Sequence, residues 1–265
     1  MPAPLVTSRA NPRVKQLRAA FAGHARLSGG LVAIEGATLL QEALHSGLPI
    51  KTVFLSERLD APAWLPRGVE LMHLTDEVFA SVVDTRSPQG VAALLVPPTW
   101  QIEDAFRPDT TPLLLVAAGL QDPGNLGTLI RSAEAFGANA VLTTPGTVSE
   151  WNQKALRASA GSVFRVPVVS VTSGEIALLK SRGVRLLAAV ADDCLSTKAL
   201  HVAEAELHQP SAIMIGNEGA GLGEEWLQMA EAFVSIPMPG PVESLNAAVA
   251  GSVLLYEASR QRIAS

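Results

Sequence analysis

The carboxyl-terminal half of this 265-residue chain alternates short apolar runs with amphipathic stretches, and no other feature constrains its fold as strongly. The apolar runs are typical of buried strands and lie at 113–118, 140–142, 166–169, 185–190, 212–215 and 232–236. Stretches with helical periodicity lie at 125–136, 151–159, 174–181, 223–230 and 244–261. Strands that alternate with helices predict an α/β fold with a mostly parallel, doubly wound sheet.

Three turns rich in glycine, asparagine or proline follow predicted strands of this half. They cover Asp122–Arg131, Gly216–Leu222 and Ile236–Ala248. In open α/β sheets, ligands bind outside the carboxyl ends of the strands, where such turns gather. The three turns therefore predict one shared pocket.

The first 96 residues predict a smaller α/β unit. Helices are expected at 12–21 and from Thr75 onward, and strands at 31–34, 52–55 and 90–96. Residues 97–111 are rich in proline and polar side chains and have no sustained periodicity, which predicts a linker. The expected domains are thus 1–96 and 112–265.

Composition excludes several classes of protein. The single cysteine, Cys194, excludes an internal disulfide, and the five histidines lack zinc-ligand spacing, so no metal is expected. No apolar run approaches the ~20 residues of a membrane-spanning helix. The first residues do not resemble a secretory signal, which predicts a cytoplasmic protein without a membrane partner.

The net charge of −5 hides a basic amino-terminal region. Residues 1–34 contain no acid and hold the cations Arg9, Arg13, Lys15, Arg18 and Arg26. Local patches decide phosphate binding more than total charge does, so this cluster is either an RNA-binding surface or the solvated face of a helix.

Each turn also has a purely structural interpretation. Asn125 can cap a helix that carries Arg131 on its solvated side, or Arg131 can enter the cleft and grip a phosphate. The glycines from Gly216 onward suit either a tight turn or a close approach to a ligand. Ser244 suits a helix cap beside the acid Glu243.

The spacing Gly-x-Gly-x-x-Gly is absent from both glycine-rich turns, which argues against a nicotinamide or flavin dinucleotide. The sequence therefore argues against a nucleotide-dependent oxidoreductase.

Taken together, the three turns and the segment Lys154–Ser162 resemble the SpoU (TrmH) family of S-adenosylmethionine-dependent RNA ribose 2′-O-methyltransferases, within the SPOUT superfamily. Residues 112–265 resemble its catalytic domain. Residues 1–96 resemble its RNA-binding domain and include Ser87–Val91 near their end. The resemblance implies a deep trefoil knot in the carboxyl-terminal part, a homodimer formed through the catalytic domain, and cofactor contacts from Gly216, Ile236 and Leu245.

The resemblance also assigns the reacting nucleotide to Arg131 and places four further residues around it: Asn125, Glu218, Ser244 and Asn246. A free guanidinium is a very poor base because its pKa exceeds ~12. Phosphate anchoring is therefore the favoured role for Arg131, and Glu218 is either the alternative base or a charge partner of Arg131.

For RNA capture, Lys154, Arg157 and Arg165 are expected to join the amino-terminal cations. Ribosomal RNA is favoured because a separate amino-terminal domain is present, and transfer RNA is the alternative. A non-catalytic RNA-binding or ribosome-assembly factor of the same fold stays open, although the five presumed site residues argue against a decayed site.

Overall fold

The computed structural model describes residues 5–24, 28–83, 85, 87–191 and 199–264, which form two compact units divided between Thr99 and Trp100. Arg26 and Cys194 lie outside the described residues. In the described part of the chain, no helix is long and apolar enough to cross a membrane.

The first unit is a five-stranded mixed sheet with helices on both faces. Its strands are β1 (Leu5–Val6), β2 (Val32–Glu35), β3 (Ile50–Ser56), β4 (Glu70–Leu74) and β5 (Val91–Leu95), in the order β1-β4-β3-β5-β2. Its helices include α1 (Pro12–Phe21), α3 (Ala37–His45) and α4 (Asp76–Ala80). Strand β5 is antiparallel to β2 and β3, whereas the other pairs are parallel.

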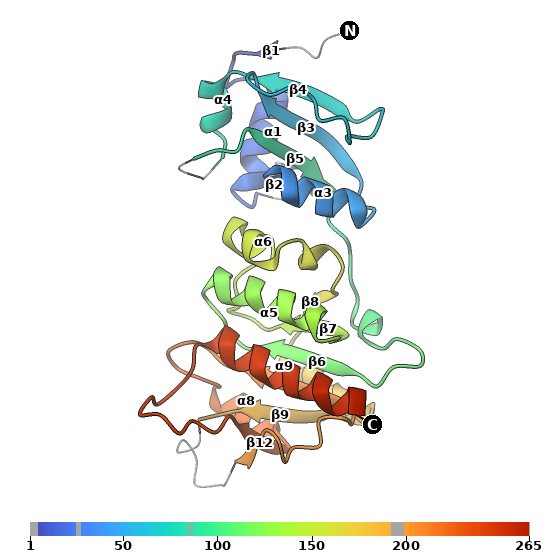
Figure 1. The fold of residues 1–265 in the computed structure, drawn as a ribbon, viewed down its shortest axis with the longest axis vertical. Helices are drawn as coiled ribbons and strands as arrows, with labels where there is room; N and C mark the ends of the chain where they lie inside the picture. Colours follow the sequence, from blue (N-terminus) through green and yellow to red (C-terminus); the bar gives the residue numbers. More distant parts are fainter. Residues whose placement is uncertain (1–4, 25–27, 84, 86, 192–198, 265) are drawn as a thin grey trace. The chain divides into compact units, whose positions relative to one another are not determined.

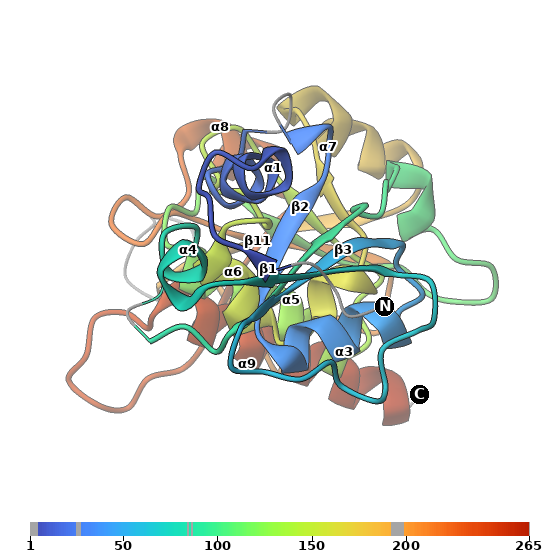
Figure 2. The same cartoon turned by 90° about the horizontal axis from the view of Figure 1, so that it is seen from above.

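Alternate side chains of these strands face opposite layers. Buried residues of α1 and α4, such as Leu17 and Phe79, pack with Ala33, Phe54 and Leu94 in one core. Figure 2 shows β2 between α1 and α3. Helix α3 therefore lies on the side of the sheet opposite to α1.

The second unit is a seven-stranded sheet in which every described pair is parallel. Its order is β10-β12-β9-β11-β6-β7-β8, with β6 (Leu113–Ala117), β7 (Ala140–Thr143), β8 (Val168–Ser170), β9 (Arg185–Ala189), β10 (Leu200–His201), β11 (Ser211–Ile215) and β12 (Ala232–Ser235). All five residues of β6 and of β11 are buried, as expected of central strands covered on both faces. The predicted mostly parallel α/β fold is confirmed.

Helices cover both faces of this sheet. They are α5 (Pro123–Ala135), α6 (Gln153–Ser159), α7 (Ser173–Ser181), α8 (Glu224–Met229) and α9 (Ala247–Ala264), with short 3₁₀ turns η1 (Ile102–Ala105) and η2 (Ser162–Phe164). Residues of α7 and α8 share one core with strand residues such as Val116 and Leu186. On the other face α5 and α9 lie side by side (Figure 1), and the hydroxyls of Ser132 and Ser252 are 2.7 Å apart between them.

Glycines permit the close helix packing on that face. A Cβ at Gly127 would lie 2.3 Å from the carbonyl oxygen of Ala155 in α6, and one at Gly251 would lie 2.4 Å from Cδ2 of Leu129. The contact of α5 with the backbone of α6 therefore requires glycine at position 127, whereas a larger residue at 251 would need the Leu129 side chain to shift.

The observed elements differ from the expected ones mainly at short strands and helix starts. Strands β1, β4 and β10 were not predicted; β1 and β10 have only two residues, and β4 lacks β-branched side chains. Helix α6 begins at Gln153 and α9 at Ala247 rather than at 151 and 244. Within the predicted linker, η1 forms and Ala105 is fully buried in a core of the second unit.

Candidate functional site

The three glycine- and asparagine-rich turns meet at one edge of the second sheet. They follow β6, β11 and β12. Ile215 at the end of β11 pairs with Ala117 at the end of β6, and Val234 in β12 pairs with Ala189 at the end of β9. Parallel strands thus bring their carboxyl ends, and the turns that follow them, together.

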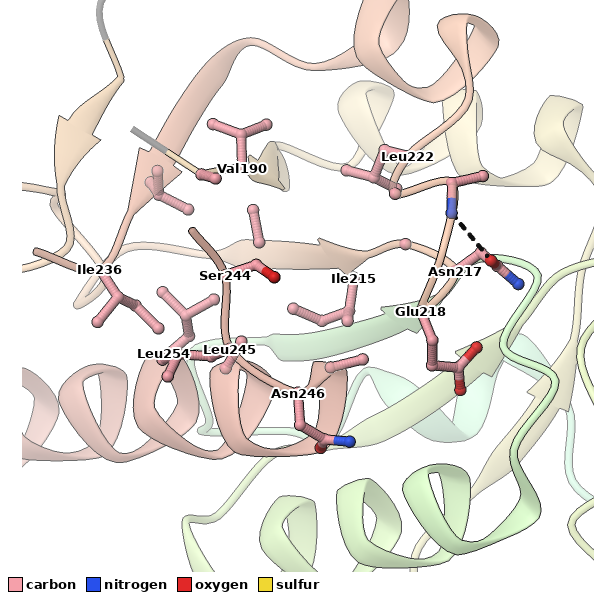
Figure 3. A pocket seen from close by; sticks show the side chains of 18 of the residues that line it. Val190, Ile215, Asn217, Glu218, Leu222, Ile236, Ser244, Leu245, Asn246 and Leu254 are labelled. Carbon is pink, nitrogen blue, oxygen red and sulfur yellow. Dashed lines mark hydrogen bonds between the residues drawn. The ribbon is translucent and has the colours of Figure 1, made fainter. Parts of the chain in front are cut away.

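A pocket of about 650 Å³ lies at this edge. The second and third turns line most of it, together with the ends of β9, β11 and β12. Figure 3 shows Ile236, Leu245 and Leu254 gathered on one side, with Leu222 and Asn217 across from them. A pocket is therefore present at the predicted edge, but only the second and third of the three turns line it, and none of the described lining residues comes from the first turn.

The pocket carries little charge. Among the described residues that line it, Glu218 is the only one with a charged side chain, and no lysine or arginine takes part. A cationic or neutral ligand therefore fits this lining better than a pyrophosphate, which needs cations or a row of free backbone amides.

One hydrogen-bonded chain of side chains joins the three turns. The Asn246 amide donates to Oδ1 of Asn125 at 3.0 Å, and the Asn125 amide donates to Oε1 of Glu218 at 2.9 Å. Glu218 also accepts backbone N–H bonds from Gln121 at 3.3 Å and Asp122 at 3.2 Å. Three of the predicted site residues are therefore in contact, although they are far apart in the sequence.

These donors set the charge state of Glu218. Partial burial acts to raise the pKa of Glu218, but the hydrogen bond from Asn125 and backbone bonds from Glu218 itself, Asp122 and Gln121 outweigh it and leave the pKa below its ordinary value. Glu218 is thus an ionised carboxylate near neutral pH and a weaker base than an ordinary glutamate.

Asp122, rather than Asn125, caps helix α5. Its Oδ1 accepts the backbone N–H groups of Gly124 at 2.6 Å and Asn125 at 3.1 Å, and Pro123 occupies the first helical position. The structural interpretation in which Asn125 caps the helix is wrong, because a cap three residues earlier already binds these amides. The side chain of Asn125 is consequently free to bind Glu218 and Asn246.

Asp122 also forms an ion pair with Lys154 of α6, with Nζ 2.8 Å from Oδ2. The hydrogen bond from Lys154, aided by the two backbone amides, lowers the pKa of Asp122. A Cβ at Gly124 would lie 3.0 Å from Cε of Lys154, so the glycine leaves room for the lysine at the first turn of α5. Sequence reasoning missed Asp122, although an aspartate directly before a proline is a recognised helix-start signal.

The second turn closes on itself. Asn217 and Gly221 exchange two backbone hydrogen bonds of 2.9 Å each, and the side chain of Asn217 accepts from Gly219 N and Ala220 N. A Cβ at Gly216 would lie 2.2 Å from the carbonyl carbon of Gly221. This close approach explains the glycine, and it exposes backbone groups to the pocket.

The third turn ends in a cap formed by Asn246. Its Oδ1 accepts from Ala248 N at 2.9 Å and Val249 N at 3.2 Å. The purely structural interpretation, in which Ser244 caps the last helix, is therefore wrong, because α9 begins three residues later. Ser244 is exposed and lines the pocket.

The predicted cationic residues differ in exposure and in whether they pair with an acid. Arg131 is exposed on α5 and does not line the pocket of its own chain, and Arg157 is exposed on α6. In the first unit, Arg9 pairs with Glu77 and Arg13 with Glu70, whereas Arg18 is 3.4 Å from Oγ of Ser81 and Lys15 is exposed. Arg165 pairs with Glu134 of α5.

Comparison with known proteins finds two matching domain families. The SpoU rRNA Methylase family matches residues 112–256, and the MRM3-like substrate binding domain matches residues 11–93.

Curated relatives match nearly the whole chain. The 23S rRNA (guanosine(2553)-2′-O)-methyltransferase RlmP of Bacillus subtilis is 32% identical over 95% of this chain and 97% of its own. The 23S rRNA (uridine(2479)-2′-O)-methyltransferase of Streptomyces viridochromogenes is 30% identical over 97% of this chain and 92% of its own.

A solved structure has the same fold over the same length. The SpoU methyltransferase AviRb from Streptomyces viridochromogenes, in complex with the cofactor AdoMet, superposes with a TM-score of 0.83 at 28% identity and covers 96% of this chain and 99% of its own.

The closed second turn yields a prediction. Gly216→Ala forces a Cβ into the backbone of Gly221 and should destabilise the unit and distort the pocket, at a cost of about 1–3 kcal/mol. Gly219→Ala is the matched control, because its Cβ would meet only Oδ1 of Asn217 at 3.7 Å. Chemical denaturation of both variants checks this, and equal midpoints for the two would contradict the close approach.

Proposed function

We propose, because the chain belongs to the SpoU rRNA methylase family, that it transfers a methyl group from S-adenosylmethionine to a ribose 2′-hydroxyl of large-subunit ribosomal RNA. The observation that carries this proposal is the pocket at the carboxyl edge of the second sheet, bounded by the second and third turns and joined to the first through Glu218. The two curated relatives methylate a guanosine and a uridine by name, so family membership does not fix the base.

The pocket residues suit this cofactor. The apolar side formed by Ile236 and Leu245 suits an adenine ring, and the open backbone beside Gly216 offers hydrogen bonds to it. The lining holds one carboxylate and no cation among the described residues, which favours a sulfonium over an anionic dinucleotide. We assign cofactor contacts to Gly216, Ile236 and Leu245 on this basis.

When bound, S-adenosylmethionine supplies a methyl group on a positively charged sulfur, which becomes neutral as the methyl passes to the 2′-oxygen and the hydroxyl proton leaves. The residues of the chain have to hold the 2′-oxygen in line with the bond between the methyl carbon and the sulfur. Ser244 and Asn246 lie on the pocket wall next to the Glu218 chain, where they can orient a ribose.

Glu218 is better suited to positioning than to accepting the proton. Its carboxylate accepts bonds from the Asn125 side chain and from the backbone amides of Gln121 and Asp122 at the start of the first turn, and those bonds lower its pKa. We assign Glu218 and Asn125 to holding the three turns in register. Arg131, with its planar guanidinium, is assigned to a phosphate of the reacting nucleotide.

The cations proposed for RNA capture differ in availability. Arg157 and Lys15 are exposed, whereas Arg9, Arg13 and Lys154 each have an acidic partner that a phosphate would have to displace. Phosphate binding by Arg9 and Arg13 of the first unit therefore requires exchange of their ion pairs, whereas Lys15 is exposed. A cytoplasmic location is proposed from the similarity to bacterial ribosomal RNA methyltransferases.

We further propose that the carboxyl-terminal segment forms a deep trefoil knot. Strand β12 lies beyond β9 in the sheet, yet α9 packs against α5 and the side chain of Ile215. The segment 236–246 has to cross the edge where the turn 216–222 closes on itself. This crossing supports threading of the chain.

The proposed reaction is tested by transfer of labelled methyl groups to unmodified large-subunit ribosomal RNA and to transfer RNA. Label in alkali-resistant linkages of the ribosomal fraction is expected, with a loss of about 100-fold or more in Arg131→Ala because the phosphate anchor that positions the reacting nucleotide is removed. Arg107→Ala, an exposed arginine elsewhere in the second unit, is the control. Cofactor binding without transfer to either RNA would instead indicate a binding factor.

A homodimer is proposed from the exposed face of α9. Val249, Val253 and Tyr256 are 49%, 36% and 55% exposed and follow one helical stripe. The ring of Tyr256 lies edge-on to Phe136, with centroids 5.7 Å apart, so the apolar surface extends to the end of α5. A contiguous apolar surface of this kind favours burial against a second copy.

In Tyr256→Glu, a charge in this stripe should convert the dimer to a monomer at micromolar concentration, as measured by light scattering after size exclusion. Leu178→Glu is the matched control on α7, where the leucine is 63% exposed. A dimer that survives Tyr256→Glu would overturn the assignment of this surface.

We propose that Arg131 completes the pocket of the partner subunit, since it does not line the pocket of its own chain. Subunits carrying Arg131→Ala are then mixed with subunits carrying Ser244→Trp, which should block the pocket. Mixed dimers should regain transfer, because one site combines an open pocket with an intact arginine. If each subunit used its own arginine, the mixture would stay inactive.

A further inference from the structure

The first unit has its own cluster of loops at one end of its sheet. Because β5 runs antiparallel to β2 and β3, Glu35 at the end of β2 lies opposite Ala92, and Leu55 near the end of β3 lies opposite Val91. The segment that precedes β5 therefore meets the carboxyl ends of β2 and β3. It contains Ser87–Gly90 and, with Val91 at the start of β5, the Ser87–Val91 stretch, to which the proposed reaction assigns no role.

Glu35 is a buried acid, only 8% exposed, and it holds this segment. The Thr85 hydroxyl donates to its carboxylate, 2.7 Å from Oε1 and 2.9 Å from Oε2, and Gln89 N donates to Oε1 at 3.4 Å. A buried carboxylate is costly unless such donors satisfy it. Thr85 and Gln89 are thus both held by the carboxylate of Glu35.

The opposite side of the segment is fastened to β3. Ser56 N donates to the carbonyl oxygen of Gly90 at 2.8 Å, and Gly36 N donates to that of Val91 at the same distance. Gly90 has a φ of +77°, and a Cβ there would lie 2.8 Å from Cδ1 of Leu59. The backbone on both sides of Gln89 is therefore fixed.

The side chain of Gln89 is exposed on this fixed backbone. A Cβ at Gly36 would lie 2.8 Å from Oε1 of Gln89, so the carboxamide rests over a glycine with a φ of +101°. Within the described part of the chain its carboxamide makes no hydrogen bond. Such exposed amides with a fixed backbone are suited to reading a base edge, because they donate and accept at once.

We propose that Gln89 binds an unpaired base of the substrate RNA through its carboxamide, and that Glu35 is a positioning residue that holds Gln89 in place. The inference rests on the proposed function, since it names a recognition element for that substrate. Sequence-specific RNA recognition targets unpaired bases, which are bound at their hydrogen-bonding edges.

Charge at this end of the sheet favours a base over a phosphate. Glu35 lies behind the segment, and Asp76 at the start of α4 accepts from Ser56 and pairs with Arg58. The nearby cation is thus already bound to an acid. A neutral base edge avoids the repulsion that a phosphate would meet beside two carboxylates.

The test measures methyl transfer as a function of the concentration of an unmodified transcript of large-subunit ribosomal RNA. Gln89→Ala should raise KM for the transcript about tenfold, equivalent to about 1.4 kcal/mol, and leave kcat and the dissociation constant of S-adenosylmethionine unchanged. Glu35→Gln should also raise KM for the transcript. Gln41→Ala, in α3 of the same unit, is the matched control.

An unchanged KM in Gln89→Ala, or a fall in kcat alone, would overturn the inference. If Glu35→Gln does not fold, Gln89→Ala still decides, because the Gln89 side chain is exposed. Filter retention of the labelled transcript separates this inference from the proposed reaction. Were the wild-type protein to bind the transcript without methylating it, a weaker retention by Gln89→Ala would still support base recognition.

Discussion

The structure of the site depends on one carboxylate, that of Glu218. Its donors come from the first turn, and through Asn125 it reaches Asn246 at the start of α9. A hydrogen bond to a charged group contributes about 1.5–3 kcal/mol, and each of these contributes less than that because Glu218 is exposed to solvent. Three loops from three separate strands are therefore kept at one edge by a small number of side chains.

This use of Glu218 limits what else the residue can do. Each bond that holds the loops also stabilises the ionised form, so the same contacts that organise the pocket weaken Glu218 as a base. What remains is a fixed negative charge in a pocket without cations among its described lining residues. Such a site favours catalysis by placement of the reacting groups, in which rigid loops matter more than a strong base.

The sequence identifies the strands of the second unit well because central parallel strands are buried on both faces and appear as continuous apolar runs. It predicts helix starts less well. Asp122, Asn125, Ser244 and Asn246 are all competent caps, and tertiary contacts decide which of them serve. Asn125 binds Glu218 only because Asp122 has taken the cap, and no local pattern reports the partnership of Asn125 with Asn246, 121 positions away.

Pairing of charges is a second property that the sequence does not reveal. The acid-free amino-terminal stretch reads as a basic surface, yet Arg9 and Arg13 meet Glu77 and Glu70 from later elements. These exposed pairs contribute little to stability, about 0–1 kcal/mol each, but a phosphate has to displace the acid before it can bind. Non-specific RNA affinity is lowered as a result. Selection of the substrate then depends on groups that bind base edges, and the exposed carboxamide of Gln89, on a backbone held by hydrogen bonds, is such a group.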